Sequence, residues 1–400
     1  PEPRILNDMR ERTLSVLGTT CQADWRVQPL ALTHPFTLSR GSRSVIPNVA
    51  VRLESDGAVG CGEAGPNPRY GESAERVEQL LGSAELRLAL EVVEGGVPEG
   101  VDEEEVFGAG WTPDRQPAVL EAVRWACGRL DIPTQYSAAL ALEAAWLELQ
   151  AVKAGRPLWR MLGAARPCTG SSSYTIGLDT PERMALKAAE RPDAEVFKVK
   201  LGMGREEDMR IMRTLREITE RPIRVDANEG WTEVAEAETM IRFLSEMGVE
   251  LVEQPMPADR VQEMAELREW SPLPLIADES FAGESGGGLD GLGGGFHGVN
   301  IKLMKTGSVL LARRILMEAK EAGLKVMSGC MIESSLGIAA GALIGVEADF
   351  VDLDGHLLIR EDPWTGLDTD SAGKVCLNAE APGLGVSPRH EWKGGSNSEG

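Results

Sequence analysis

The chain has 400 residues, of which 42% are hydrophobic and 26% are charged, as is usual for a globular protein. Its formal net charge of -22 weighs against nucleic acid as a partner, because phosphate binding needs clustered lysine and arginine. No apolar run approaches the roughly 18 residues of a membrane span, and no charged-then-apolar leader opens the chain. We therefore expect a cytoplasmic protein without a membrane partner.

The cysteines point to neither a zinc site nor a disulfide framework. There are six of them, scattered along the chain without a C-x-x-C pair. We expect reduced thiols.

Residues 1–165 are predicted to form a strand-then-helix (α+β) domain. Residues 1–24 show no period and are taken as an extension. A strand over 49–53 leads to the turn signal Asp56-Gly57, which predicts a hairpin. Helical patterns follow over 72–81, 117–130 and 137–154. Ser137 is expected to cap the last of them, and Gly155 and Pro157 to end it.

From residue 171 onward, short β-branched apolar runs alternate with helical patterns, which is typical of βα units. Eight runs are predicted strands, centred near Thr175, Val199, Val225, Val252, Ile276, Ile301, Met327 and Val351. Eight strands close a barrel, so the fold class is α/β with a barrel domain over residues 166–362. Residues 363–400 lose this period; they are predicted to pack back on the first domain and to end in a disordered tail.

A glycine-rich segment, 283–298, separates the fifth and sixth predicted strands. It contains a formal G-x-G-x-x-G match, but no helix follows and Asp290 would repel a pyrophosphate. We interpret the segment as a mobile surface loop, which disfavours an NAD-dependent enzyme.

Five consecutive strands, from the second to the sixth, end in a charge. In a parallel barrel these ends meet at the edge where barrel enzymes hold their active sites. Three carboxylates among them, those of Asp226, Glu253 and Asp278, would converge and repel each other unless a cation lay between them. Oxygen ligands of this kind predict a Mg²⁺ site.

Lysines end the second and sixth strands, nearly opposite each other in an eight-stranded barrel. Lys200 and Lys302 could therefore remove a proton from one face of a substrate α-carbon and return one to the other face. Lys198 lies on the same face of its strand as Lys200 and would spread the charge of the enediolate formed on deprotonation. A lysine base needs a lowered pKa, which Lys198 and Mg²⁺ are expected to provide. Lys305 is interpreted as loop or helix-start decoration.

These residues resemble the motifs of the enolase superfamily, in its muconate-lactonising-enzyme-like subgroup. The matching segments are Lys198-Val199-Lys200, Asp226-Ala227-Asn228, Glu253-Gln254-Pro255, Asp278-Glu279-Ser280 and Asn300-Ile301-Lys302. The resemblance implies an N-terminal α+β capping domain and a modified (β/α)₇β TIM barrel. It also implies Asp226, Glu253 and Asp278 as Mg²⁺ ligands, Lys200 and Lys302 as acid/base catalysts, and a homo-oligomer.

Strand eight carries an Asp-x-Asp pair, Asp352 and Asp354, on one face. Two carboxylates at a barrel mouth can hold an ammonium group, and the pair resembles the dipeptide epimerase branch. The resemblance implies a small-molecule L-L dipeptide whose second residue is inverted. Thr175, Cys330 and Arg40 are the further predicted substrate-binding residues. The alternative for the pair is a salt bridge to Arg360 or an exposed strand end.

The class of dipeptide stays open at this point. Arg40 and Arg43 lie in the loop that, in this family, folds over the barrel mouth, and family members that take an acidic second residue use an arginine there. Registered on Pro35-Phe36, Gly41 falls at that position, so acidic, cationic and hydrophobic residues all remain possible. A cycloisomerase or lyase of the same superfamily and a non-catalytic metal-binding homologue are the competing interpretations.

Overall fold

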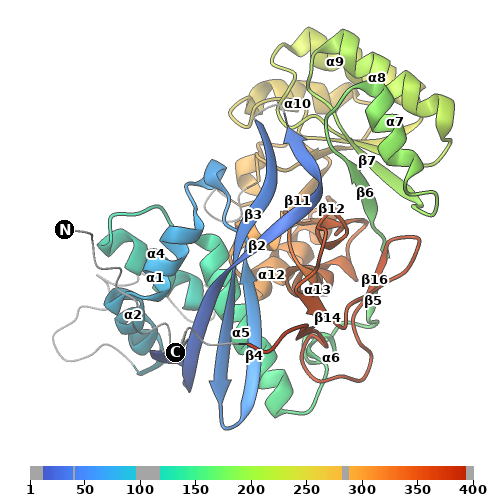
Figure 1. The fold of residues 1–400 in the computed structure, drawn as a ribbon. Coiled ribbons are helices and arrows are strands. Elements are labelled where there is room, and N and C mark those ends of the chain that lie inside the picture. The colour runs from blue at the N-terminus through green and yellow to red at the C-terminus, as the bar shows by residue number, and fades with distance from the viewer. Residues whose placement is uncertain (1–11, 39–40, 96–117, 282–287, 393–400) are drawn as a thin grey trace, which may run out of the picture.

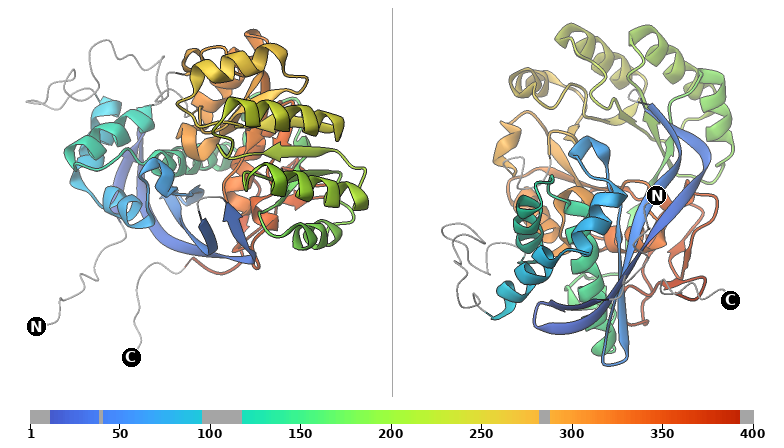
Figure 2. Two further views of the ribbon diagram at one scale, coloured as in Figure 1. Left: turned by 90° about the horizontal axis from the view of Figure 1, so that it is seen from above. Right: turned by 60° about the vertical axis from the view of Figure 1, so that its left-hand side comes forward.

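The computed structural model describes residues 12–38, 41–95, 118–281 and 288–392. Arg40 and the predicted disordered tail from residue 393 lie outside these ranges. Among the described residues, none of the helices combines the length and the apolar character that a membrane-spanning helix needs. Figures 1 and 2 show an antiparallel sheet with its helices on one side of a barrel.

The N-terminal sheet is an antiparallel meander of four strands in sequence order. They are β1 (Arg12–Val16), β2 (Thr19–Leu38), β3 (Gly41–Ser55) and β4 (Ala58–Ala64). The prediction that residues 1–24 are an extension is therefore wrong for residues 12–24, which form β1 and the start of β2. Leu14 and Val16 are buried on one face of β1, but two alternating residues are too short a pattern to reveal a strand.

The predicted hairpin at Asp56-Gly57 is confirmed, with φ values of 52° and 76° that suit a tight turn between twisted strands. Strand β4, which follows it, packs closely on a helix. A Cβ atom on Gly60 or Gly62 would lie 2.0 Å from a carbonyl oxygen of that helix. Glycine is required at both positions because the backbones touch.

Helices complete this part of the chain and include the three that were predicted. They are α1 (Ala74–Leu81), α2 (Ala84–Gly95), α4 (Ala118–Arg129), α5 (Tyr136–Lys153) and α6 (Leu158–Met161). Helix α5 ends before Gly155, as expected, but Ser137 does not cap it. Ser137 is buried in the first turn, and its backbone N–H donates to the carboxylate of Glu72.

Each of the eight predicted strands is present, and together they form one parallel sheet. They are β6 (Ser173–Ile176), β7 (Val196–Lys200), β8 (Ile223–Asp226), β9 (Val249–Glu253), β10 (Leu275–Ala277), β11 (Gly298–Lys302), β12 (Lys325–Gly329) and β13 (Phe350–Asp352). They pair in sequence order, and a parallel bridge between Ser172 and Val351 joins the first strand to the last. The sheet is thus a nearly closed barrel.

Helices cover the outside of the barrel (Figure 2). They are α7 (Pro181–Ala189), α8 (Arg205–Ile218), α9 (Val234–Glu246), α10 (Val261–Trp270), α11 (Leu303–Thr306), α12 (Val309–Glu321) and α13 (Ser335–Gly345). Between β10 and β11, residues 282–287 lie outside the described ranges. The rest of the glycine-rich segment is a surface loop with exposed residues at 290, 291, 293 and 294, and it is anchored by the buried side chains of Leu292 and Phe296.

Residues after 362 return to both parts of the molecule. Their short strands are β14 (Trp364–Thr365), β15 (Asp368–Thr369), β16 (Lys374–Cys376) and β17 (Ser387–Pro388). The indole N–H of Trp364 donates to Gln28 Oε1 of the N-terminal sheet at 3.0 Å. The N–H of Leu158 donates to the Gly383 carbonyl at 2.8 Å.

Strand β16 pairs with β5 (Cys168–Ser171), and a disulfide joins Cys168 to Cys376. The expectation of six reduced thiols is therefore wrong for these two residues, while the other four remain thiols. Because the pair is 208 residues apart in sequence, only the fold brings the two sulfur atoms together.

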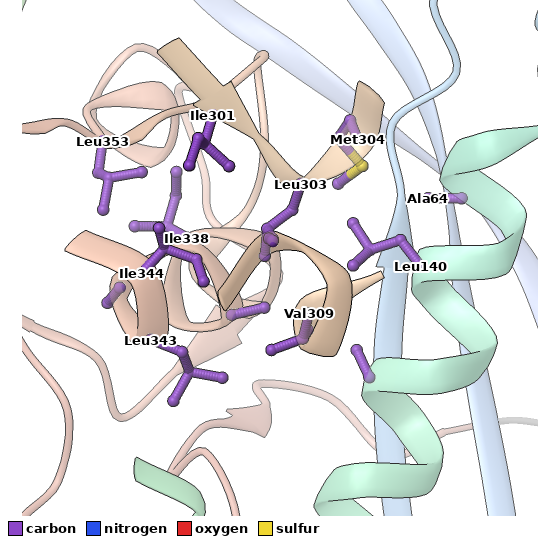
Figure 3. Close-up of a cluster of buried hydrophobic side chains, with 14 of the residues drawn as sticks. Ala64, Leu140, Ile301, Leu303, Met304, Val309, Ile338, Leu343, Ile344 and Leu353 are labelled. Carbon is purple, nitrogen blue, oxygen red and sulfur yellow. The ribbon is translucent and has the colours of Figure 1, made fainter. Parts of the chain in front are cut away.

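One apolar core joins the sheet domain to the barrel. Figure 3 shows Ala64 and Leu140 of the N-terminal domain beside Leu303, Met304 and Val309 of the barrel. Helix α11, which directly follows β11, is thereby packed against α5. This contact fixes the end of the sixth barrel strand relative to the sheet domain.

Candidate functional site

Three buried carboxylates stand together at the carboxyl edge of the barrel. Asp226 and Glu253 end β8 and β9, where the two residues are direct partners in the sheet register, and Asp278 follows β10. One oxygen atom from each lies within 4.8 Å of the others. Parallel pairing puts strand ends at one level, so the convergence follows from the sheet itself.

The triad fits a hard divalent cation such as Mg²⁺. One oxygen atom of Asp226 accepts the N–H of Asn228 at 2.9 Å, and Glu253 Oε1 accepts the Asn300 amide at 2.8 Å. The other oxygen atom of Asp226 and of Glu253, and Oδ2 of Asp278, each contact a lysine ammonium. These oxygen atoms are therefore placed to attract positive charge. Burial and the charge of Asp226 raise the pKa of Glu253 to about 7, a cost that a bound dication would remove.

The three predicted lysines all line one cavity of about 690 Å³. Lys198 Nζ lies 2.6 Å from Glu253 Oε2 and 2.6 Å from Asp352 Oδ2. Lys200 Nζ lies 2.6 Å from Asp226 Oδ2, on the same face of β7. Lys302 Nζ approaches from β11, 2.8 Å from Asp278 Oδ2. Strands β7 and β11 are the second and sixth of eight, so the amines of Lys200 and Lys302 face the triad from opposite sides.

The carboxylates of the site raise the pKa values of two of these lysines, and for Lys302 this direction is opposite to the predicted one. Burial works to lower the pKa of the Lys302 ammonium, but the carboxylates of Asp278 and Glu253 outweigh it and raise the pKa. For Lys198, burial is likewise outweighed by Asp352, Glu253 and Asp226, and the pKa lies well above its ordinary value. The prediction counted the positive neighbours and omitted the carboxylates in direct contact with the amines.

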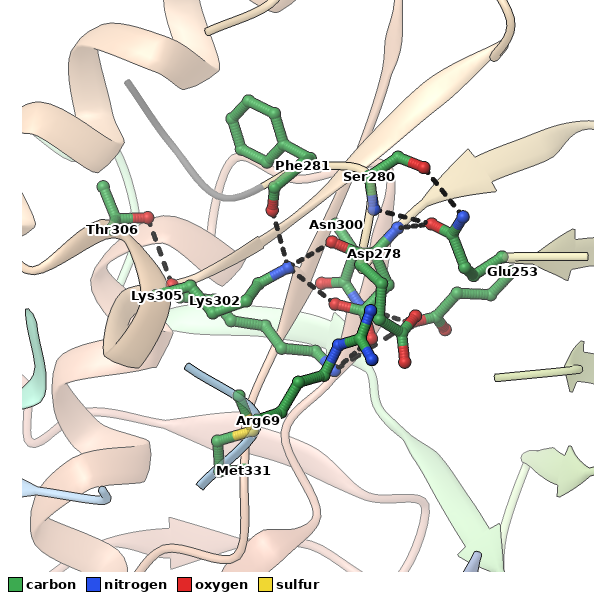
Figure 4. Close-up of polar contacts among 12 residues, drawn as sticks. Arg69, Glu253, Asp278, Ser280, Phe281, Asn300, Lys302, Lys305, Thr306 and Met331 are labelled. Carbon is green, nitrogen blue, oxygen red and sulfur yellow. Dashed lines mark hydrogen bonds and ion pairs between the residues drawn. The ribbon is translucent and has the colours of Figure 1, made fainter. Parts of the chain in front are cut away.

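Lys305 is part of the site and not the decoration that was predicted. Its ammonium is buried and contacts Asp278, as Figure 4 shows. Burial works against ionisation of Asp278, but Lys302 and Lys305 outweigh it and hold the pKa of that carboxyl well below its usual range. Lys305 thus contributes to the charge of a predicted metal ligand.

Both aspartates of the Asp-x-Asp pair are buried at the cavity, and they differ in their partners. Asp352 accepts the Ser173 hydroxyl at 2.6 Å and pairs with Lys198, so the alternative of a salt bridge to Arg360 does not hold for it. Asp354 Oδ2 accepts the Thr175 N–H at 2.6 Å. Burial and the charge of Asp352 raise the pKa of Asp354 to about 6.

The remaining predicted residues have mixed outcomes. Thr175 and Cys330 line the cavity, and burial together with the charge of Glu333 raises the pKa of the Cys330 thiol well above its ordinary value. Arg40 lies outside the described residues. Arg43, three residues further on, does line the cavity.

Several cavity residues that sequence reasoning missed come from the N-terminal domain. The hairpin of β2 and β3 reaches the barrel, where the Leu178 N–H donates to the Thr37 carbonyl at 3.2 Å. The loop after β4 forms another part of the wall. These residues are Phe36, Ile46, Asn48, Asn67, Arg69 and Tyr70. The dense turn residues at 66–68 were a signal for a loop, but nothing local placed that loop over the barrel.

Known proteins resemble this chain over most of its length. Residues 182–392 match the family model described as Enolase C-terminal domain-like. An L-Ala-D/L-Glu epimerase from Bacteroides thetaiotaomicron is 35% identical over 358 residues, covering 89% of this chain and 85% of that protein. An L-Ala-D/L-amino acid epimerase from Flavobacterium johnsoniae is 36% identical, covering 84% of this chain and 91% of that protein.

A solved structure is similar as well. It is the dipeptide epimerase from Methylococcus capsulatus complexed with Mg and the dipeptide L-Arg-D-Lys. It superposes with a TM-score of 0.75 at 29% identity, covering 91% of this chain and 98% of that one. The fold, the strand-end motifs and these relatives agree with the resemblance drawn from the sequence. The chain therefore belongs to the enolase superfamily, in its subgroup of mandelate racemase and muconate-lactonising enzymes.

Proposed function

We propose that this protein is a Mg²⁺-dependent isomerase that inverts the α-carbon of the second residue of a dipeptide. The observation that carries the proposal is the position of two amines on opposite sides of one acidic triad. Lys200 and Lys302 line the same cavity from β7 and β11, with Asp226, Glu253 and Asp278 around them. An α-carbon held there presents one face to each amine.

The relatives support a dipeptide as the substrate. The solved homologue from Methylococcus capsulatus carries Mg and a dipeptide, and the curated relatives named above are epimerases of alanyl dipeptides. The sequence prediction of a dipeptide epimerase agrees with all three.

The lysines perform the proton transfers. One amine removes the α-proton, the charge passes to the substrate carboxylate as an enediolate, and the opposite ammonium returns a proton to the other face. Lys198 directs its ammonium into the same space and stabilises that developing negative charge. Mg²⁺, when bound to the triad, would neutralise its carboxylates and attract the carboxylate of the substrate.

The second role in the site is to hold the ammonium end of the dipeptide. Asp354 has one oxygen on the Thr175 N–H and is not paired with a lysine in the described part of the chain. Asp352 is paired with Lys198. Asp354 is therefore the residue that binds the substrate ammonium, while Asp352 fixes the Lys198 amine.

The second residue of the dipeptide is acidic in this proposal. Arg43 lines the cavity and is exposed, and no carboxylate among the described residues pairs with it. The neighbouring Arg69 is already paired with Glu229 at 2.7 Å. A substrate carboxylate would give the Arg43 guanidinium the partner that the described residues do not supply.

A panel of dipeptides in D₂O tests the proposal. We expect L-Ala-L-Glu to exchange its second α-proton faster than L-Ala-L-Leu or L-Ala-L-Lys, measured by NMR. Arg43→Gln is expected to lower kcat/KM for L-Ala-L-Glu about 10- to 150-fold, because a hydrogen bond to a charged group contributes about 1.5–3 kcal/mol. Arg52→Gln is the control, since Arg52 lies on the same strand and pairs with Glu54 instead.

The outcomes separate the two parts of the proposal. Equal rates on all three dipeptides and no effect of Arg43→Gln would remove the acidic specificity alone. If no dipeptide of a broad L-L library exchanged its α-proton, the proposed dipeptide epimerase activity would be ruled out. The homo-oligomer stays a prediction, which light scattering after size exclusion would check.

A further inference from the structure

Lys305 makes three contacts that no other lysine of the site makes. It lies on α11, three residues after Lys302, and is 4% exposed. Its ammonium donates to Asp278 Oδ1 at 2.7 Å, to the Asp278 carbonyl at 2.5 Å and to the Phe281 carbonyl at 2.8 Å. Figure 4 shows these bonds converging on one nitrogen atom. All three N–H donors of the ammonium are used.

The contacts clamp the turn that carries Asp278. The Phe281 N–H already donates to the Asp278 carbonyl at 3.1 Å, and Lys305 binds the carbonyl oxygen atoms at both ends of this turn. Gln254 supports it from the other side, because its Oε1 accepts the N–H groups of Asp278 and Ser280 at 3.0 Å each. Groups outside the cavity therefore hold the backbone of this turn and one side-chain oxygen atom of Asp278.

The two oxygen atoms of Asp278 have different partners. Oδ1 is held by Lys305, whereas Oδ2 faces Lys302 at 2.8 Å. Lys302 lines the cavity and Lys305 does not. Lys305 therefore lies outside the cavity lining, yet by holding Oδ1 it directs Oδ2 of Asp278 toward Lys302.

Contacts between helix α11 and the N-terminal domain hold Lys305 in place. Met304 on the same turn accepts the Gly65 N–H of the N-terminal domain on its sulfur at 3.1 Å and packs in the shared core. Gly307 ends the helix with a φ of 78°. The anchor of Asp278 is therefore tied to the contact between the two domains.

We propose that Lys305 is a positioning residue that holds Asp278 in the orientation needed to bind Mg²⁺. The inference rests on the proposed Mg²⁺ dependence, but it does not depend on the identity of the substrate. Residues that orient a metal ligand typically contribute 10- to 100-fold to metal affinity. We expect an effect of that size here.

Titration calorimetry with Mg²⁺ alone tests this role. Lys305→Met is expected to weaken Mg²⁺ binding about 10- to 100-fold. In the epimerase assay the same variant should need more Mg²⁺ for half-maximal rate, with kcat recovering at saturating Mg²⁺. Thr306→Val is the matched control, because Thr306 is buried on the same turn and, among the described residues, its hydroxyl donates to the Lys302 carbonyl at 3.1 Å and not to Asp278. It should bind Mg²⁺ as the wild type does.

Other results would overturn the inference. A folded Lys305→Met variant with wild-type Mg²⁺ affinity contradicts it, and so does an equal loss in Thr306→Val. If Lys305→Met does not fold, Lys305→Arg replaces it: the planar guanidinium cannot reproduce the three contacts, so Mg²⁺ binding must still weaken. Weaker Mg²⁺ binding in a protein that epimerises no dipeptide supports the positioning role and removes the proposed function instead.

Discussion

The charge of Asp354 gives a sharp prediction, because its environment separates it from the neighbouring Asp352. Asp354 is buried and lines the cavity, and one of its oxygen atoms accepts the Thr175 N–H at 2.6 Å. Asp354→Asn keeps the size of the side chain and an oxygen acceptor for that N–H. It removes only the negative charge that would meet the substrate ammonium.

The size of the effect follows from the lost charge. A hydrogen bond between charged groups contributes about 1.5–3 kcal/mol, so kcat/KM for a free dipeptide should fall about 10- to 150-fold in Asp354→Asn. The pH dependence follows from the raised pKa of about 6, which burial and Asp352 cause. The ionised carboxylate binds the ammonium more tightly than the neutral one, so wild-type kcat/KM should fall as the pH drops below about 6 and level off about 10- to 150-fold lower. The variant should lack that dependence.

The assay compares a free dipeptide with its N-acetyl derivative, which carries no ammonium group, over pH 5–8. The derivative should react equally slowly with the wild type and with Asp354→Asn. Asp352→Asn should differ from both by lowering kcat, because Asp352 holds the Lys198 amine at 2.6 Å. Unchanged kcat/KM for the free dipeptide in Asp354→Asn would refute the reasoning and favour a lyase or cycloisomerase whose substrate has no ammonium group.

Three further predictions concern the metal and stability. Removal of divalent ions by EDTA should abolish α-proton exchange in D₂O, and Mg²⁺ should restore it. Burial raises the pKa of Glu143 to about 7, so its proton stabilises the fold below pH about 4.5 and this stabilisation is lost as the pH rises through 7. Urea titrations should show the wild type losing about 3 kcal/mol more than Glu143→Gln between pH 4.5 and 8. Cys168→Ser should lower the free energy of unfolding by about 2–5 kcal/mol without reductant, and reductant should not destabilise that variant further.

The barrel could be predicted from the sequence because its signal is local and repeated. Each strand is a short apolar run, and five in succession end in a charge, as Val225-Asp226 does. Parallel pairing then brings these ends to one edge without further information. For that reason the triad and the lysines of β7 and β11 could be predicted from the sequence.

The predictions that were wrong concern features that depend on contacts between segments far apart in the sequence. Lys305 was interpreted as decoration of a loop or helix start because its partners, Asp278 and Phe281, lie more than twenty residues earlier. The disulfide of Cys168 and Cys376 needs the C-terminal segment to return to the start of the barrel. No period or motif in a single sequence records such pairings.

The prediction of a lowered lysine pKa was wrong for a different reason. The sequence showed Lys198 beside Lys200, which suggested a positive field. The structure adds that the amines of Lys198 and Lys302 contact buried carboxylates of the triad, and these contacts raise the pKa values of both lysines. The balance of these charges depends on distances of 2.6–3.2 Å, which only coordinates provide.

Proton exchange by single-lysine variants tests the central claim most directly. Lys200→Ala and Lys302→Ala are each incubated in D₂O with the L-L dipeptide and, separately, with its epimer. The account predicts that neither variant epimerises, that each exchanges the α-proton of one epimer only, and that the two variants act on opposite epimers. Exchange of both epimers by either variant, or wild-type epimerisation by either, would contradict it.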